Sequence, residues 1–179
     1  MTALFYGVAI ILVVLIVGVY VSWRAGRLDR LHARTDAART ALDLALVRRS
    51  SSAYELASSG LLDPATSVLL GDAVRRTKEG DQPRDLAESD LTRALRAAFS
   101  QEDLLVSLKD NDGAEELVGE LAAAAHQVFL ARKFYNDVAL RAIDARRRPL
   151  ARAFRLAGNA PQPEFFDMDD ALADADGRR

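Results

Sequence analysis

The amino-acid sequence predicts an all-α protein, with a single N-terminal transmembrane helix followed by an antiparallel bundle of about four helices. Three observations support this fold class. Residues 3–23 contain no charged side chain. Hydrophobic residues make up 50% of the chain, yet β-branched residues are scarce outside that stretch. Further along, apolar residues recur at steps of three and four, the spacing that keeps them on one face of a helix.

The apolar stretch at 3–23 is predicted to be a membrane anchor, assigned to residues 1–23. As a helix it is about 31 Å long, close to the thickness of the hydrocarbon core of a bilayer. No basic residue precedes it, and Val21-Ser22-Trp23 is a poor cleavage site, so a cleaved signal peptide is the weaker interpretation. Tyr20 and Trp23 suit the headgroup level at one end of the span.

The charges that flank this anchor predict its orientation. No Lys or Arg precedes the apolar stretch, whereas Arg24, Arg27, Arg30 and Arg34 follow it closely. The positive-inside rule therefore places the N-terminus outside and the C-terminal domain in the cytoplasm, as in a single-pass protein of the cell membrane. The absence of cysteine agrees with a reducing compartment.

The first helix is predicted to continue from the membrane span to about Ser58. Its core positions step by three and four from Leu28 to Leu56, apart from a gap that spans Arg49 and Ser52. The first helix is therefore expected to be long, with one apolar stripe along it.

The second and third helices are defined by their end signals. Asp63 followed by Pro64 is typical of an N-cap and a first helical position, so the second helix begins there and runs to about Lys78, before Gly80. The third helix is predicted over 84–108, with a bend near Ser100.

The fourth helix has the clearest apolar stripe, from Leu117 to Ala142, and is expected to end before Pro149. Short connections between the helices predict an antiparallel arrangement. The sequence thus predicts three segments: the anchor at 1–23, a helical bundle at 24–157, and a flexible acidic tail at 158–179 that contains Pro161 and Pro163.

The stretch Ala131 to Val138, which reads ARKFYNDV, resembles the C-terminal signature of the LemA family. The family's Arg-x-x-Tyr-Asn motif matches Arg132, Tyr135 and Asn136 directly. This resemblance implies a membrane-anchored helical bundle, and it supplies no enzymatic activity. The segment 140–143 departs from the family's pattern, and no family motif occurs between 61 and 112.

No residue constellation typical of catalysis is present. The chain has two histidines, His32 and His126, no cysteine, and no Gly-rich phosphate loop. We therefore expect no enzyme activity, no cofactor and no metal site. A net charge of −2 argues against nucleic-acid binding. Tyr135 and Asn136 are interpreted as a packing and hydrogen-bonding anchor, the alternative being a pair that contacts a ligand or partner.

A basic cluster near the end of the fourth helix is the best candidate for a functional surface. These side chains would contact anionic lipid headgroups or a protein partner. The cluster consists of five arginines and one phenylalanine: Arg146, Arg147, Arg148, Arg152, Phe154 and Arg155. The alternative is that these arginines are solvated or pair with the acidic tail, whose carboxylates are Glu164, Asp167, Asp169, Asp170, Asp174 and Asp176.

The favoured function is a non-enzymatic scaffold or interaction module at the cytoplasmic face of the membrane, with a protein partner that the sequence does not identify. One alternative is a ligand-binding or enzymatic module with a site between helices. Another is a coiled-coil signalling or septal membrane protein that dimerises through the first helix.

Overall fold

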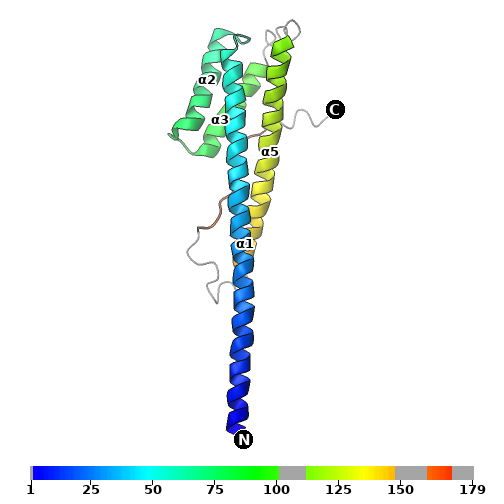
Figure 1. Ribbon diagram of the computed structural model, residues 1–179. Coiled ribbons are helices and arrows are strands. Elements are labelled where there is room, and N and C mark those ends of the chain that lie inside the picture. The colour runs from blue at the N-terminus through cyan, green and yellow to red at the C-terminus, as the bar shows by residue number, and fades with distance from the viewer. Residues whose placement is uncertain (1, 101–111, 148–160, 171–179) are drawn as a thin grey trace. The chain divides into compact units, whose positions relative to one another are not determined.

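A computed structural model describes residues 2–100, 112–147 and 161–170 of the chain. Within these ranges all regular secondary structure is helical, which confirms the all-α prediction. The helices are α1 (Thr2–Ser58), α2 (Pro64–Glu79), α3 (Arg84–Phe99) and α5 (Asp112–Arg147), and they are labelled in Figure 1. Residues 161–170 form no helix.

The predicted transmembrane anchor at 1–23 is contradicted. Within the residues that the structure describes, no helix combines the length and the apolar character that crossing a membrane requires. The predicted single-pass topology and its location in the cell membrane, with the N-terminus outside, depended on that anchor and are corrected with it.

The helix ends follow the local chemistry that the sequence displays. The Asp63 carboxylate accepts hydrogen bonds from the backbone N–H groups of Ala65 and Thr66, and Pro64 occupies the first helical position. Gly80 ends α2 with a φ of 72°, a left-handed conformation that glycine adopts without a Cβ penalty. The end of α1 at Ser58 agrees with the prediction. Helix α3 ends at Phe99, and the predicted part from 101 to 108 lies outside the described residues.

The chain divides into two compact units. The first unit comprises residues 1–38 and 136–165, and the second comprises 39–135 and 166–179. Both α1 and α5 contribute a part to each unit. The predicted limits of the bundle and of the flexible tail stay predictions.

The second unit contains the main hydrophobic core. Leucines from all four helices are buried in one cluster: Leu56 of α1, Leu70 of α2, Leu91 and Leu95 of α3, and Leu121 of α5. Each such side chain contributes about 1.5–3 kcal/mol when it leaves water. Since these positions recur at helical spacing within each helix, the apolar stripes of the sequence account for this core.

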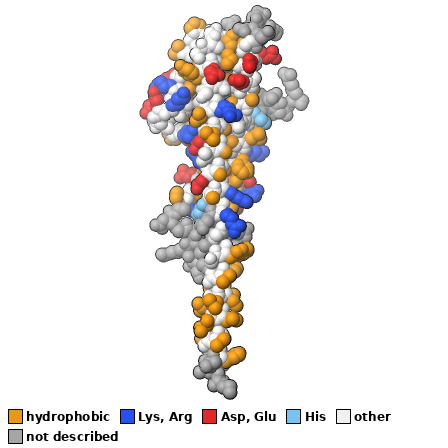
Figure 2. Space-filling view, in the orientation of Figure 1, with side chains coloured by type: hydrophobic (Ala, Val, Ile, Leu, Met, Phe, Trp, Pro, Cys, Tyr) orange, Lys and Arg blue, Asp and Glu red, His pale blue; other side chains and the backbone are white. Residues whose placement is uncertain are grey.

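In the first unit, the side chains described from Phe5 to Tyr20 are all exposed, and Figure 2 shows hydrophobic groups around this part of α1. Further along the same unit, Arg146 Nη2 lies 2.8 Å from His32 Nε2. Because the guanidinium can only donate, His32 Nε2 is the acceptor in this contact.

Candidate functional site

An extended segment, 166–170, lies against the helices of the second unit; we call it the C-terminal strap. Phe166 and Met168 are 4% and 5% exposed, whereas Asp167 between them is exposed. In an extended chain successive side chains point to opposite sides, which explains this alternation over 166–168. Phe166 and Met168 therefore pack against the helices from one face of the strap.

Arg39 of α1 holds the aromatic end of the strap. Its guanidinium carbon is 5.1 Å from the ring centroid of Phe166 and 5.4 Å from that of Tyr135 in α5. Arginine near an aromatic face contributes about 0.5–1 kcal/mol at exposed sites and more when water is excluded. One cation thus contacts a ring of the strap and a ring of the helical framework.

Two further arginines bind the acidic end of the strap. Arg96 Nη2 of α3 donates to Asp169 Oδ2 at 2.6 Å. Arg132 of α5 donates to Asp170 Oδ2 through both Nε, at 2.9 Å, and Nη2, at 2.5 Å. Such charge-assisted bonds are shorter and stronger than bonds between neutral groups.

Ser89 fixes the backbone of the strap. The Asp169 N–H donates to Ser89 Oγ at 3.0 Å, and the same hydroxyl donates to the backbone carbonyl of Asp85 at 2.7 Å. A backbone contact of this kind sets which strap residue lies opposite which helix residue. The strap is therefore held by side chains and by its main chain.

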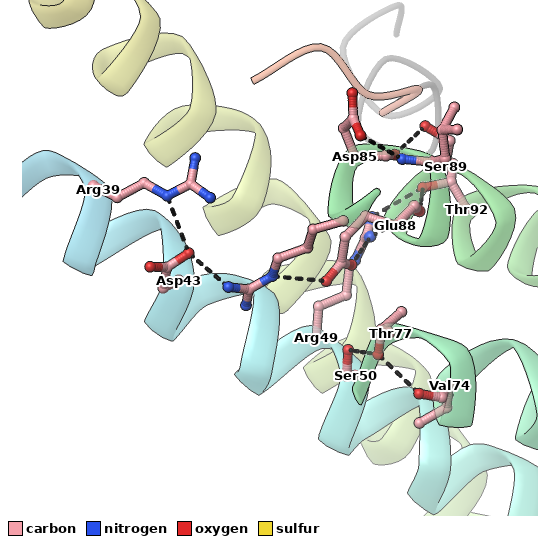
Figure 3. Close-up of polar contacts among 12 residues, drawn as sticks. Arg39, Asp43, Arg49, Ser50, Val74, Thr77, Asp85, Glu88, Ser89 and Thr92 are labelled. Atoms are coloured by element: carbon pink, nitrogen blue, oxygen red, sulfur yellow. Dashed lines mark hydrogen bonds and ion pairs between the residues drawn. The ribbon is translucent and has the colours of Figure 1, made fainter. Parts of the chain in front are cut away.

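Beneath this surface, an ion pair is buried between α1 and α3 (Figure 3). Arg49 Nη2 donates to Glu88 Oε2 at 2.7 Å and to the Glu88 carbonyl at 3.1 Å, while Nη1 donates to Thr92 Oγ1 at 2.9 Å. The two charged side chains are 1% and 2% exposed. Burial raises the pKa of the Glu88 carboxyl, and the Arg49 guanidinium opposes this rise.

A chain of polar contacts joins the strap to this buried pair. Arg39 Nε lies 3.5 Å from Asp43 Oδ1, and the same oxygen accepts from Arg84 Nη1 at 2.9 Å. Arg84 Nε in turn lies 4.0 Å from Glu88 Oε1. Arg39, which contacts Phe166, is therefore linked through Asp43 and Arg84 to the buried Glu88 (Figure 3).

The structure places one of the three motif residues against the strap and a second against Arg39, which itself contacts the strap. Arg132 binds Asp170, and buried Tyr135 contacts Arg39. Asn136 is half-buried and belongs to the first unit. The packing and hydrogen-bonding role expected for Tyr135 and Asn136 stays a prediction, and the contact of Tyr135 with Arg39 adds a reason to test it.

The predicted basic cluster is described only in part. Arg146 bonds His32, and Arg147 lines a shallow cavity of the first unit together with Leu140 and Phe165. The remaining members, Arg148, Arg152, Phe154 and Arg155, lie outside the described residues, so the lipid or partner contact stays a prediction. Of the acidic residues proposed as alternative partners, Asp169 and Asp170 bind Arg96 and Arg132 instead; Asp174 and Asp176 lie outside the described residues.

Sequence reasoning missed Arg39, Arg49, Glu88 and Arg96 as functional or structural groups. A signal for the buried pair was present. Arg49 stands in the gap of the first apolar stripe, and Glu88 precedes Leu91 at helical spacing on the third. Two opposite charges on core-facing stripes predict a buried ion pair. Arg39 and Arg96 carry no comparable signal, because arginines are spread along the whole chain.

Over the described ranges, no group of three or more acidic or histidine side chains is placed to hold a metal ion. No family model, curated protein or solved structure matches the chain. The resemblance to the LemA family therefore stays a prediction.

Proposed function

We propose that the second unit is a non-enzymatic interaction module that binds an extended acidic segment of a partner protein, and that the strap occupies this surface in the resting chain. The observation that carries the proposal is the contact of Phe166, Asp169 and Asp170 with three arginines from three different helices. An aromatic anchor together with paired carboxylates is the chemistry by which arginine-rich surfaces recognise peptides.

The framework supports this role because one of the three arginines, Arg39, is held by a contact outside the strap. Arg39 is ion-paired to Asp43, and the Asp43 carboxylate is itself bound by Arg84. Side chains fixed in this way lose less conformational entropy on binding. The Arg39 end of the surface is thus suited to receive an aromatic side chain with little rearrangement.

The energy balance of the strap favours exchange. Burying Phe166 and Met168 contributes about 1.5–3 kcal/mol each, and partly exposed ion pairs contribute about 0–1 kcal/mol each. Ordering five residues costs about 1–2 kcal/mol for each backbone unit. These terms nearly cancel, so a bound strap can open and a partner segment can replace it.

The test is binding of a fluorescent peptide with the sequence of residues 161–179 to the full-length chain that carries Phe166→Ala and Asp170→Asn, which weaken its own strap. Saturable binding by fluorescence anisotropy is expected. Adding Arg132→Gln should weaken binding about fivefold, which corresponds to about 1 kcal/mol. The matched control is Lys133→Gln, which removes an exposed positive charge on the neighbouring residue and should leave binding unchanged. Absence of saturable binding, or equal losses in both variants, would contradict the proposal.

A further inference from the structure

We infer that this surface reads a five-residue pattern, aromatic–any–apolar–Asp–Asp, and that the strap is an internal competitor that a partner segment with this pattern must displace. The inference rests on the proposed function and names the partner's chemistry. It is drawn from the pattern of burial and contacts along 166–170.

The first three positions differ in how closely the surface contacts them. Phe166 is buried and lies against the Arg39 guanidinium, so a ring is favoured at the first position. Met168 is buried, which favours an apolar side chain at the third. Asp167 is exposed, so we expect the surface to accept any side chain at the second position, although this chain has a charged one there.

The two carboxylates are bound by separate arginines. The side chains of Arg132 and Asp170 are 20% and 14% exposed, whereas those of Arg96 and Asp169 are 52% and 37% exposed. Solvent screens the more exposed pair more strongly. Asp170 should therefore contribute more to recognition than Asp169 does.

Ser89 defines the register between these positions. Its Oγ accepts a hydrogen bond from the backbone N–H of Asp169, which fixes the position of the strap relative to α3. A shift by one residue would turn the apolar side chains away from the helices, since the side chains of an extended segment alternate. The pattern is thus read in one frame, and net charge alone is insufficient.

Covalent attachment makes the strap an effective competitor. A tethered segment experiences an effective concentration in the millimolar range, so an external segment with the same contacts binds the intact chain weakly. Its apparent affinity falls by the fraction of chains in which the surface is free. Weakening the strap should therefore strengthen binding of an external segment.

The experiment compares peptides of residues 161–170 in anisotropy competition against the full-length Phe166→Ala/Met168→Ala chain. Peptides with Asp167→Asn and Asp170→Asn have the same net charge and form the matched pair. We expect Asp167→Asn to bind within about twofold of the native peptide, Asp170→Asn about fivefold more weakly, and Phe166→Ala about tenfold more weakly. Circular dichroism checks that the chain variant keeps its helices.

The outcomes separate the two claims. Equal losses for Asp167→Asn and Asp170→Asn would overturn the five-residue pattern while leaving acidic-segment binding intact. No binding by any peptide would overturn the proposed function as well. The unmodified chain should bind the native peptide about tenfold more weakly than the Phe166→Ala/Met168→Ala chain, and equal affinities would overturn the role of the strap as competitor.

Discussion

The second unit uses the same chemistry, arginine with a carboxylate, in two regions that differ in burial. The Arg49–Glu88 pair is enclosed between α1 and α3, while the Arg132–Asp170 pair joins α5 to a segment that forms no helix. A buried charge that loses its partner is costly, whereas a partly exposed one regains water. The comparison teaches that the first pair fixes the framework and the second is suited to reversible binding.

The largest expected effect comes from breaking the buried pair. Glu88→Ala leaves the Arg49 guanidinium buried without its counter-charge, so the free energy of unfolding should fall by about 3–5 kcal/mol. Urea denaturation followed by circular dichroism measures this change. A loss below about 1 kcal/mol would show that the pair is solvated, because only exposed pairs have so small an effect.

Replacing both partners sharpens the same point. Arg49→Met with Glu88→Leu keeps the volume apolar and removes both charges, so most of the lost stability should return. Thr92 loses its contact with Arg49 but still donates to the Glu88 carbonyl. If the double variant is as unstable as Glu88→Ala, the loss of packing and not the unpaired charge explains the defect.

The pH dependence of stability gives a smaller effect. Because burial raises the folded-state pKa of Glu88 above its unfolded value, the folded chain holds this proton more tightly. The contribution of this group to stability is full below the unfolded pKa and is lost as the pH rises through the folded one. Glu88→Gln removes this contribution. The stability of the native chain relative to Glu88→Gln should therefore fall as the pH rises from the unfolded-state pKa of Glu88 through its folded-state pKa. An unchanged difference would contradict the raised pKa.

Weakening the strap should scarcely affect global stability. Arg132→Gln removes the two hydrogen bonds to Asp170 Oδ2, and the free energy of unfolding should change by about 1 kcal/mol or less. Release of the strap should instead expose Phe166 and accelerate chymotrypsin cleavage there. Lys133→Gln is the control, and equal cleavage rates in both variants would count against the contact.

The smallest effect is expected at the other acidic position. Arg96→Gln removes a pair in which both side chains are more than a third exposed, so its effect on strap cleavage should be weaker than that of Arg132→Gln. The comparison uses the same protease assay. A larger effect for Arg96→Gln would reverse the ranking of the two strap contacts.

Much of the helical framework could be predicted from the sequence, because its signals are local. The Asp63-Pro64 start, the end at Gly80 and the apolar stripe through Leu121 each act over a few residues. The predicted anchor at 1–23 was wrong, since no helix among the described residues is long and apolar enough to cross a membrane.

The candidate site could be predicted only in part, because its contacts join distant residues. Arg132 and Tyr135 were singled out by a motif, but nothing local indicated that Asp170 and Arg39 would be their partners. The binding of the strap depends on tertiary contacts between segments 38 or more residues apart. The sequence shows that apolar Phe166 and Met168 flank the charged Asp167. This spacing alone does not identify the surface that covers the two apolar side chains.

Native-state hydrogen exchange of the Asp169 amide tests the central claim most directly, namely that a detachable strap covers a fixed helical surface. This amide donates to Ser89 Oγ, whereas the Leu95 amide lies within α3 in the core. The account predicts that Asp169 exchanges by local opening, with a free energy well below that of Leu95. Equal opening free energies for the two amides, with the same urea dependence, would contradict it, because the strap would then open only when the unit unfolds.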